Sequence, residues 1–300
     1  MGSMSARSSG AEALAARGVG RRYGRDVVAL EKIDLAFEPG LTIGIIGNNG
    51  SGKSTLLRLW AGNDKPSEGS AEVLGGNPEK DKQLRARIGY VAQSSVLDPE
   101  MTGAETLRLF ANLYSLPLDE ASTVSRFGLE KVVGRRVSEY SGGFRQRLHL
   151  AIGFLHDPEV LLLDEPSNRL DREGKRALWE IISERKSKGR TTVIVTHDLG
   201  DAAKYCSHVV VLHNGRLVAS GDPGEIVRRY GFWTLRVDDK VVGQFQSRGE
   251  ALAAKDEFLA SHHDFLGFHL TEPSLESAFE TLTGERFEAK REPRERGRKK

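Results

Sequence analysis

The sequence predicts an α/β fold built on a mostly parallel β-sheet. Short apolar runs such as LTIGIIG, IGYVAQ, VLLLDE and TTVIVTH are typical of strands that are buried on both faces. Helical patterns separate these runs along the chain, and such alternation is the pattern of parallel strands joined by helices. The composition, 38% hydrophobic and 29% charged, is that of an ordinary globular protein.

The elements before residue 226 are expected to form one large domain. Residues 1–13 are polar and small, and we expect a disordered N-terminus that includes the remnant of a tag. Residues 14–225 carry the alternating strand and helix patterns of an α/β domain. Within this range, about 94–158 lacks strand signals, and its amphipathic patterns predict a helical insertion. VVVLHNGRLVASG predicts a β-hairpin, because Asn-Gly favours a two-residue turn.

The remaining residues, 226–284, predict a small α+β domain. WTLRVDDKVVGQF indicates a second hairpin, and Ser247 with Glu250 forms the capping box of a following helix. FLGFHLTE is expected to be a strand, and PSLESAFETLTG a closing helix that ends at Gly284. Residues 285–300 are strongly basic and are expected to be a disordered tail.

The bulk composition excludes several classes of protein. Cys206 is the single cysteine, so an internal disulfide is impossible and a reducing cytosol is expected. No apolar run approaches the roughly 20 residues of a membrane helix, and the N-terminus lacks the apolar core of a signal peptide. A net charge of +2 gives no reason to expect nucleic acid as a partner. Packing roles are expected for Cys206 and for Trp60, Trp179 and Trp233, and a solvated loop for His262–Asp264.

A glycine-rich loop between a strand and a helix predicts a nucleotide site. IGIIGNNGSGKSTLLRL contains Gly47, Gly52, Lys53 and Ser54 in the spacing of the phosphate-binding P-loop. Its glycines let backbone N–H groups converge on phosphate oxygens, and the helix adds its positive end. Lys53 is predicted to reach the β- and γ-phosphates of ATP, and Ser54 to hold Mg²⁺. The residues assigned to this loop are Gly47, Asn48, Asn49, Gly50, Ser51, Gly52, Lys53, Ser54 and Thr55.

Polar side chains follow three other predicted strands. VLLLDEPS ends in two acids, and Asp164 is expected to bind Mg²⁺ while Glu165 activates a water as general base. His197, after VIVT, is predicted to hydrogen-bond the γ-phosphate. Gln93 follows IGYVA, and its amide oxygen is a candidate to ligate Mg²⁺ and orient the water. Each residue alone has an ordinary structural explanation, and the combination with the phosphate loop favours catalysis.

The stretch EYSGGFRQRLHLA indicates a second anion site. Ser141, Gly142 and Gly143 open a predicted helix, whose free N–H groups and positive dipole end suit an anion. Since the phosphate loop already provides one such site, this second one needs a different explanation.

Together these motifs resemble the nucleotide-binding subunit of ATP-binding-cassette (ABC) proteins, over roughly residues 14–225. The resemblance rests on Tyr23, the phosphate loop, Gln93, YSGGFRQRL, LLLDEP and His197 in this order. It implies a P-loop NTPase core with an antiparallel β subdomain. It also implies that Tyr23 stacks on adenine, and the less favoured alternative is a surface tyrosine in a β-turn.

The resemblance also implies partners. Two subunits meet head to tail in this family, so Ser141, Gly142 and Gly143 would face ATP held by the second subunit, which is expected to be an identical chain. Asp171 follows LLLDEP in a loop that contacts the partner. The C-terminal PSLESAFETLTG is similar to exporter ATPases whose permease is a separate chain. The implied function is therefore ATP hydrolysis that powers a separate membrane permease, at the cytoplasmic face of the cell membrane.

Three positions depart from the family pattern. Tyr140 and Phe144 flank Ser-Gly-Gly where leucine and glutamine are common, and Arg169 replaces a glycine before Leu170 and Asp171. The change at Arg169 affects the expected contacts across the dimer.

Two other functions remain open from sequence alone. One is a soluble ABC-type regulatory or assembly ATPase without transport activity. Coiled-coil repair ATPases and two-cassette translation factors do not fit, because residues 93–141 leave no room for a coiled coil and the chain has one phosphate loop. The other is a different P-loop enzyme such as a kinase, which needs neither Ser-Gly-Gly nor the acid pair followed by His197.

Overall fold

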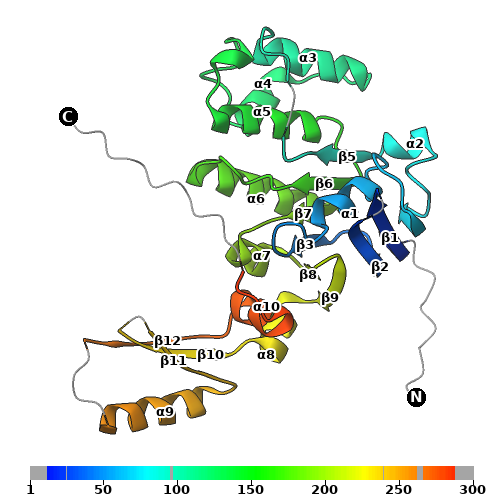
Figure 1. Cartoon of the computed structure of the whole chain (residues 1–300). Coiled ribbons are helices and arrows are strands. Elements are labelled where there is room, and N and C mark those ends of the chain that lie inside the picture. Colours follow the sequence, from blue (N-terminus) through cyan, green and yellow to red (C-terminus); the bar gives the residue numbers. More distant parts are fainter. Residues whose placement is uncertain (1–11, 25, 95–96, 239, 262–265, 288–300) are drawn as a thin grey trace.

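A six-stranded sheet forms the centre of the molecule (Figure 1). The computed structural model describes residues 12–24, 26–94, 97–238, 240–261 and 266–287. In spatial order the strands are β5 (Ile88–Val91), β6 (Val160–Asp164), β7 (Thr191–Val195), β3 (Thr42–Ile46), β8 (His208–His213) and β9 (Arg216–Gly221). The first five are parallel to their neighbours and β9 is antiparallel to β8, which confirms the mostly parallel sheet.

The apolar strand sequences are explained by burial on both faces of this sheet. Every residue of β3, β6 and β7 is buried. Along β6, Leu161 and Leu163 belong to one hydrophobic core, whereas Val160 and Leu162 belong to another. Because successive side chains of a strand point to opposite faces, the sheet separates these two cores.

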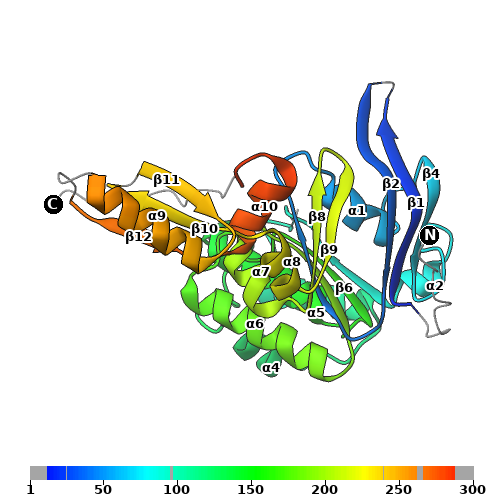
Figure 2. The same ribbon diagram turned by 90° about the horizontal axis from the view of Figure 1, so that it is seen from below.

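The helices pack around the central sheet (Figures 1 and 2). They are α1 (Lys53–Trp60), α2 (Lys82–Arg85), α3 (Gly103–Leu113), α4 (Glu120–Arg126), a 3₁₀ turn η1 (Val137–Glu139), α5 (Gly142–Phe154), α6 (Arg172–Ser187), α7 (Leu199–Tyr205), α8 (Pro223–Tyr230), α9 (Arg248–Ser261) and α10 (Leu275–Thr283). Between β5 and β6 the described residues form helices and no strand longer than an isolated bridge, as the sequence predicted.

The implied antiparallel β subdomain is present beside α1. Its three strands, in the order β2-β1-β4, are β2 (Val27–Phe37), β1 (Leu14–Tyr23) and β4 (Glu68–Val73). Trp60 at the end of α1 is fully buried, and its indole Nε1 donates to the Ala15 carbonyl at 2.9 Å. The predicted packing role of Trp60 is therefore confirmed.

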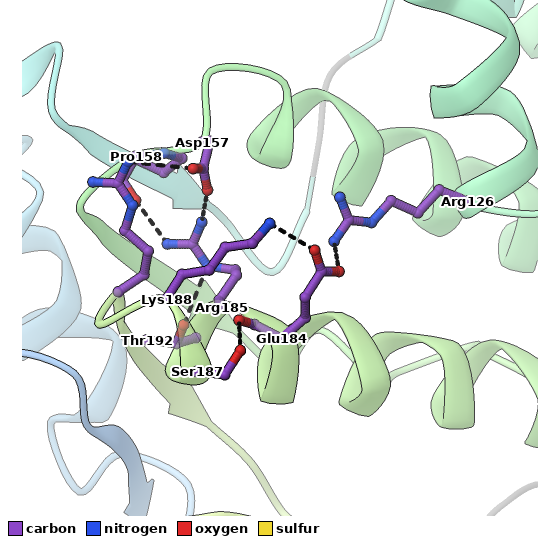
Figure 3. A network of polar contacts seen from close by, with 9 residues as sticks. Arg126, Asp157, Pro158, Glu184, Arg185, Ser187, Lys188 and Thr192 are labelled. Carbon is purple, nitrogen blue, oxygen red and sulfur yellow. Dashed lines mark hydrogen bonds and ion pairs between the residues drawn. The ribbon is translucent and has the colours of Figure 1, made fainter.

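A buried arginine joins the end of the helical segment to α6 (Figure 3). The guanidinium of Arg185 donates to Asp157 Oδ1 at 2.7 Å and to the Pro158 carbonyl at 2.8 Å, just before β6 begins. The neighbouring residue in α6, Glu184, pairs with Lys188 at 2.7 Å and with Arg126 of α4 at 2.5 Å. These contacts connect the helical segment to the α6 face of the sheet.

The C-terminal part has the predicted α+β elements. A second antiparallel sheet, in the order β11-β10-β12, contains β11 (Lys240–Phe245), β10 (Trp233–Val237) and β12 (Phe268–Thr271), and α9 packs beside it. Ser247 Oγ accepts from the Glu250 N–H at 3.2 Å, but the Glu250 carboxylate returns to the N–H of Gln246. The predicted capping box is thus correct in its first half and shifted by one residue in its second. Gly284 ends α10 in the left-handed conformation, as expected.

The hairpin between β8 and β9 also follows the prediction. Asn214 and Gly215 both have positive φ, 48° and 76°, which is the geometry of a tight type I′ turn. Across the described residues, no helix combines the length and apolar character needed to cross a membrane.

Candidate nucleotide-binding site

The predicted site residues follow four neighbouring parallel strands. The phosphate loop follows β3, Gln93 follows β5, Asp164 and Glu165 end β6, and His197 follows β7. Since β5, β6, β7 and β3 are adjacent and parallel, their carboxyl ends meet at one edge of the sheet. Ligands of open α/β sheets bind at this edge.

The phosphate loop has the backbone that its glycines allow. A Cβ on Gly47 would lie 2.3 Å from the Leu212 carbonyl oxygen, and one on Gly52 would lie 2.5 Å from the Ala29 carbonyl oxygen. Gly52 and Gly50 have φ of 101° and 77°, which L-residues rarely adopt. Gly52 is the N-cap of α1, so this loop opens directly onto the positive end of the helix.

Lys53 lies along the inner side of this loop. Its Nζ donates to the carbonyl oxygens of Gly47 and Asn48, both at 2.8 Å, and the residue is 6% exposed. Thr55 and Ser51 are also buried, and Ser51 Oγ has no hydrogen-bond partner. Asn49 and Gly50 are exposed at the tip.

Asp164 presents an unpaired carboxylate oxygen close to the phosphate loop. The residue is 3% exposed and its Oδ1 makes no hydrogen bond. Burial raises the pKa of Asp164, while a hydrogen bond from the Ser54 hydroxyl acts in the opposite direction. A buried acceptor without a donor, next to a hydroxyl, has the chemistry of a divalent-cation ligand.

Glu165 lies at the centre of a polar cluster. Gln93 Nε2 donates to Glu165 Oε2 at 3.0 Å, and His197 Nε2 lies 2.6 Å from Glu165 Oε1. Because a carboxylate accepts, we assign the His197 proton to Nε2. Asn168 Nδ2 also donates to Glu165 Oε2. The structure therefore brings Gln93, Glu165 and His197 together and adds Asn168 to them.

The loop after β6 has an unusual backbone at two positions. Glu165 has φ of 51° and Arg169 has φ of 67°, although neither is glycine. Left-handed conformation costs a non-glycine residue about 1 kcal/mol, and such strain gathers at functional sites. Arg169 therefore occupies a backbone position that suits the glycine it replaces.

Tyr23 is the last residue of β1, and its hydroxyl makes two hydrogen bonds. Its hydroxyl donates to Asp64 Oδ2 at 2.6 Å and accepts from Arg58 of α1 at 2.8 Å. The Arg21 guanidinium lies 4.4 Å from the ring centroid. Any base that stacks on this ring must use the face that Arg21 leaves open.

The Ser-Gly-Gly element lies beside the loop after β6. Ser141 is the N-cap of α5 and, like Gly142, is exposed, and a Cβ on Gly143 would lie 3.0 Å from the Arg169 carbonyl oxygen. Among the described residues, no hydrogen bond or ion pair joins the Ser-Gly-Gly residues to the phosphate loop. Asp171 caps α6 through the Gly174 N–H at 2.8 Å and pairs with Arg147 of α5 at 2.5 Å.

The cysteine and Trp179 pack against neighbouring side chains, as expected. Cys206 is buried against β3, where a Cβ on Gly44 would meet its Sγ at 2.9 Å, so its packing role is confirmed. Trp179 stacks on Tyr205 at 4.5 Å. Within the described part of the chain, no His, Cys, Asp or Glu cluster has the arrangement of a metal site. The segment His262–Asp264 lies outside the described residues.

Comparisons with known proteins agree with this geometry. The family model described as ABC transporter matches residues 30–168. A Nod factor export ATP-binding protein I of Cupriavidus metallidurans is 34% identical over 217 residues, which cover 70% of this chain and 71% of that protein. This chain belongs to the ABC transporter family.

Other ABC proteins give the same result. A daunorubicin resistance ATP-binding protein of Streptomyces coeruleorubidus is 34% identical over 238 residues, which cover 77% of this chain and 75% of that protein. A solved structure of the ATP-binding subunit of an ABC transporter has a TM-score of 0.66 and 31% identity, and the match covers 72% of this chain and 92% of that one. The chain is thus an ATP-binding and ATP-hydrolysing subunit of the ABC family, with the expected P-loop fold. The comparisons give no support to the regulatory ATPase without transport.

Two contacts of the ABC site were missed from sequence. Asn168 touches Glu165, but an asparagine after Pro-Ser is an ordinary turn residue with no signal of its own. Glu285 and Arg286, expected to begin a disordered tail, instead contact the phosphate loop, where Asn48 Nδ2 donates to Glu285 Oε2 at 3.1 Å. Arg286 and Phe287 line a cleft of about 1560 Å³ together with Gln93, Asn168 and His197.

Proposed function

We propose that this ABC subunit powers a separate membrane permease by closing against a second copy of itself when ATP binds and reopening after hydrolysis. The observation that carries the proposal is the arrangement of Gln93, Glu165 and His197 at the same sheet edge as the phosphate loop. Under this proposal the chain comprises an ATPase domain (14–225), with a helical subdomain at about 94–158, and a C-terminal accessory domain (226–284).

The phosphates are expected to bind along the loop from Gly47 to Thr55. Backbone N–H groups of the loop and the N-terminus of α1 face the α- and β-phosphates. Lys53 exchanges its contacts to the Gly47 and Asn48 carbonyls for contacts to the β- and γ-phosphates. Tyr23 stacks on the adenine with its open face.

Mg²⁺ fits the residues next to this loop. The partnerless Oδ1 of Asp164, the Ser54 hydroxyl and the Gln93 amide oxygen are the candidate ligands. When bound, the ion would neutralise charge on the β- and γ-phosphate oxygens. Because Asp164 is buried and lacks a donor for Oδ1, a cation there removes the cost of an unpaired buried carboxylate oxygen.

Glu165 is proposed as the general base. Its carboxylate accepts a proton from a water whose oxygen forms a bond to the γ-phosphorus, while the bond from that phosphorus to the ADP oxygen breaks. Gln93, His197 and Asn168 hold the carboxylate in one orientation, so the base is positioned before the water arrives. His197 can then turn its Nε2–H toward the γ-phosphate.

The second anion site is proposed to act across a dimer. Ser141, Gly142 and Gly143 are accessible at the start of α5 and, among the described residues, are not bonded to their own phosphate loop. In a head-to-tail dimer they would meet the γ-phosphate held by the partner copy, so ATP joins the two subunits and hydrolysis releases them. Asp171 and Arg169 would lie at the same interface.

Export is proposed as the direction of transport. The support is that the similar proteins include a Nod factor export protein and a drug resistance protein. A permease partner places the chain at the cytoplasmic face of the membrane. Purification of the chain from detergent-solubilised membranes should recover a multi-span protein in near-equal amount. Recovery of soluble partners alone would refute the transport function.

The dimer and the base are tested together by Glu165→Gln. This variant should bind ATP without hydrolysing it and therefore accumulate as an ATP-bound dimer on size exclusion with ATP and Mg²⁺. Glu130→Gln, at an exposed acid of the helical segment, is the matched control and should stay active. Hydrolysis by Glu165→Gln at the wild-type rate would remove the general-base assignment.

A further inference from the structure

Residues that directly follow α10 contact the phosphate loop of the same molecule. We call residues Glu285–Phe287 the C-terminal strap. Asn48 Nδ2 donates to Glu285 Oε2 at 3.1 Å and lies 3.4 Å from the Arg286 carbonyl oxygen. The same Glu285 carboxylate oxygen lies 3.8 Å from Nδ1 of His213, at the end of β8.

The aromatic end of the strap lies against the catalytic cluster. The Phe287 ring is 6.1 Å from the His197 ring, and it makes an edge-to-face contact with Phe279 of α10 at 4.9 Å. Phe279 is itself buried. The strap is therefore anchored on a packed helix at one end and covers His197 at the other.

A rigid element sets the direction of the strap. Ser274 caps α10 through the Ser277 N–H, and Leu275 and Phe279 are buried in the core beneath. Gly284, with φ of 73°, turns the chain at the end of α10 toward the phosphate loop. The strap thus leaves a fixed helix through a single left-handed glycine.

The position of Glu285 conflicts with ATP. Lys53 Nζ contacts the Asn48 carbonyl, and a P-loop lysine serves the β- and γ-phosphates, so Asn48 marks the γ-phosphate end of the loop. A carboxylate held there repels the γ-phosphate, which is also anionic. Because the Glu285 side chain is 54% exposed, it can leave this position without breaking a packed core.

We propose that the C-terminal strap is an autoinhibitory element that competes with the γ-phosphate end of ATP at Asn48 and covers His197. This inference rests on the proposed function of the phosphate loop. ATP binding must lift the strap, and the strap thereby weakens the apparent affinity for ATP and delays assembly of the catalytic site. ADP, which lacks the γ-phosphate, is expected to bind with much less interference.

The test compares nucleotide affinities of full-length variants by calorimetry. If the strap is in place about nine-tenths of the time, Glu285→Ala should bind the non-hydrolysable analogue AMP-PNP about tenfold more tightly. Phe287→Ala should act in the same direction, because it removes the other attachment. Glu272→Ala is the matched control, since Glu272 is an exposed acid before α10. ADP affinity should change little in all three.

The possible results separate the strap from the site it covers. Unchanged AMP-PNP affinity in both strap variants, with binding lost in Lys53→Ala, would overturn the strap while preserving the phosphate site. An equal gain for ADP and AMP-PNP would overturn the competition with the γ-phosphate. Normal AMP-PNP binding by Lys53→Ala would instead remove the phosphate-loop assignment on which the inference rests.

Discussion

Changing Asp157 to asparagine should destabilise the protein only while Arg185 is present. Asp157 pairs with Arg185 at 2.7 Å, and the side chains are 54% and 3% exposed. Burial lowers the pKa of Arg185 to about 10, and the charge of Asp157 acts against this shift. Asparagine is a suitable replacement because it tolerates the φ of 38° at this position and removes only the charge.

The solvent exposure of the Asp157–Arg185 pair determines how much stability Asp157→Asn should cost. Breaking a fully buried ion pair costs about 3–5 kcal/mol, because the remaining charge is left uncompensated. Since Asp157 is half exposed, we expect about 1–2 kcal/mol for Asp157→Asn. Arg185→Met removes the buried charge and leaves the Pro158 carbonyl without its donor, which costs about 1–3 kcal/mol.

A double-mutant cycle checks the reasoning. In the Arg185→Met background the partly exposed pair of Asp157 with Arg190, at 3.3 Å, is the ion pair that remains for Asp157, so Asp157→Asn should cost less than about 0.5 kcal/mol. The free energies of unfolding in urea of the wild type, both single variants and the double variant give the coupling, expected at about 1–2 kcal/mol. If the two single effects add within about 0.3–0.5 kcal/mol, Asp157 does not compensate the buried guanidinium.

Three further predictions concern the site, a buried histidine and the cysteine. Asn168→Ala should lower kcat about tenfold with KM for ATP unchanged, because the amide orients Glu165 and does not touch the nucleotide. A tenfold rise in KM at unchanged kcat would contradict this role. Burial lowers the pKa of His149 to about 4 from 6.5, so the folded protein holds the neutral form and the free energy of unfolding should fall by up to about 3 kcal/mol as pH drops from 6.5 to 4. His149→Gln should flatten this fall in urea titrations, and a fall as steep as that of the wild type would refute the assignment. Burial also raises the pKa of the Cys206 thiol to about 12, so iodoacetamide at pH 8 should label it only in urea, and rapid labelling of the folded protein would show that the thiol is accessible.

The sequence predicted the parts of the site whose chemistry is local. The spacing from Gly47 to Ser54 determines the phosphate loop by itself, since its glycines and lysine are neighbours in the chain. Gln93, Glu165 and His197 could be placed at one edge because each follows a buried strand, and parallel strands share the edge at which they end.

The parts that were missed depend on contacts between distant residues. Asn48 and Glu285 are 237 positions apart, and nothing in either local pattern indicates their contact. A strongly basic composition is typical of tails that do not fold. The strap is nevertheless held by Phe279, which belongs to the helix before it. The order of the strands, with β3 between β7 and β8, likewise follows from packing of the whole sheet rather than from any single segment.

The backbone conformation of Arg169 is a third feature that the sequence alone did not reveal. Arg169 departs from the expected glycine in sequence, yet its φ of 67° shows that the backbone keeps the conformation a glycine would favour. The substitution therefore changes the side chain offered beside Gly142 and Gly143, where the Arg169 carbonyl already lies close, and leaves the course of the loop intact.

Mixing two inactive variants tests whether each ATP is hydrolysed between one chain's phosphate loop and the partner's Ser-Gly-Gly. Lys53→Ala lacks a working phosphate loop, and Ser141→Arg lacks a working Ser-Gly-Gly element. In a head-to-tail mixed dimer, one site combines the intact loop of the second variant with the intact Ser-Gly-Gly of the first. Each variant alone should be inactive, and an equal mixture should recover up to about a quarter of the wild-type ATPase rate, because half of the dimers are mixed and one of their two sites is intact. A mixture as inactive as its components, although both chains are folded and dimerise, would contradict the account.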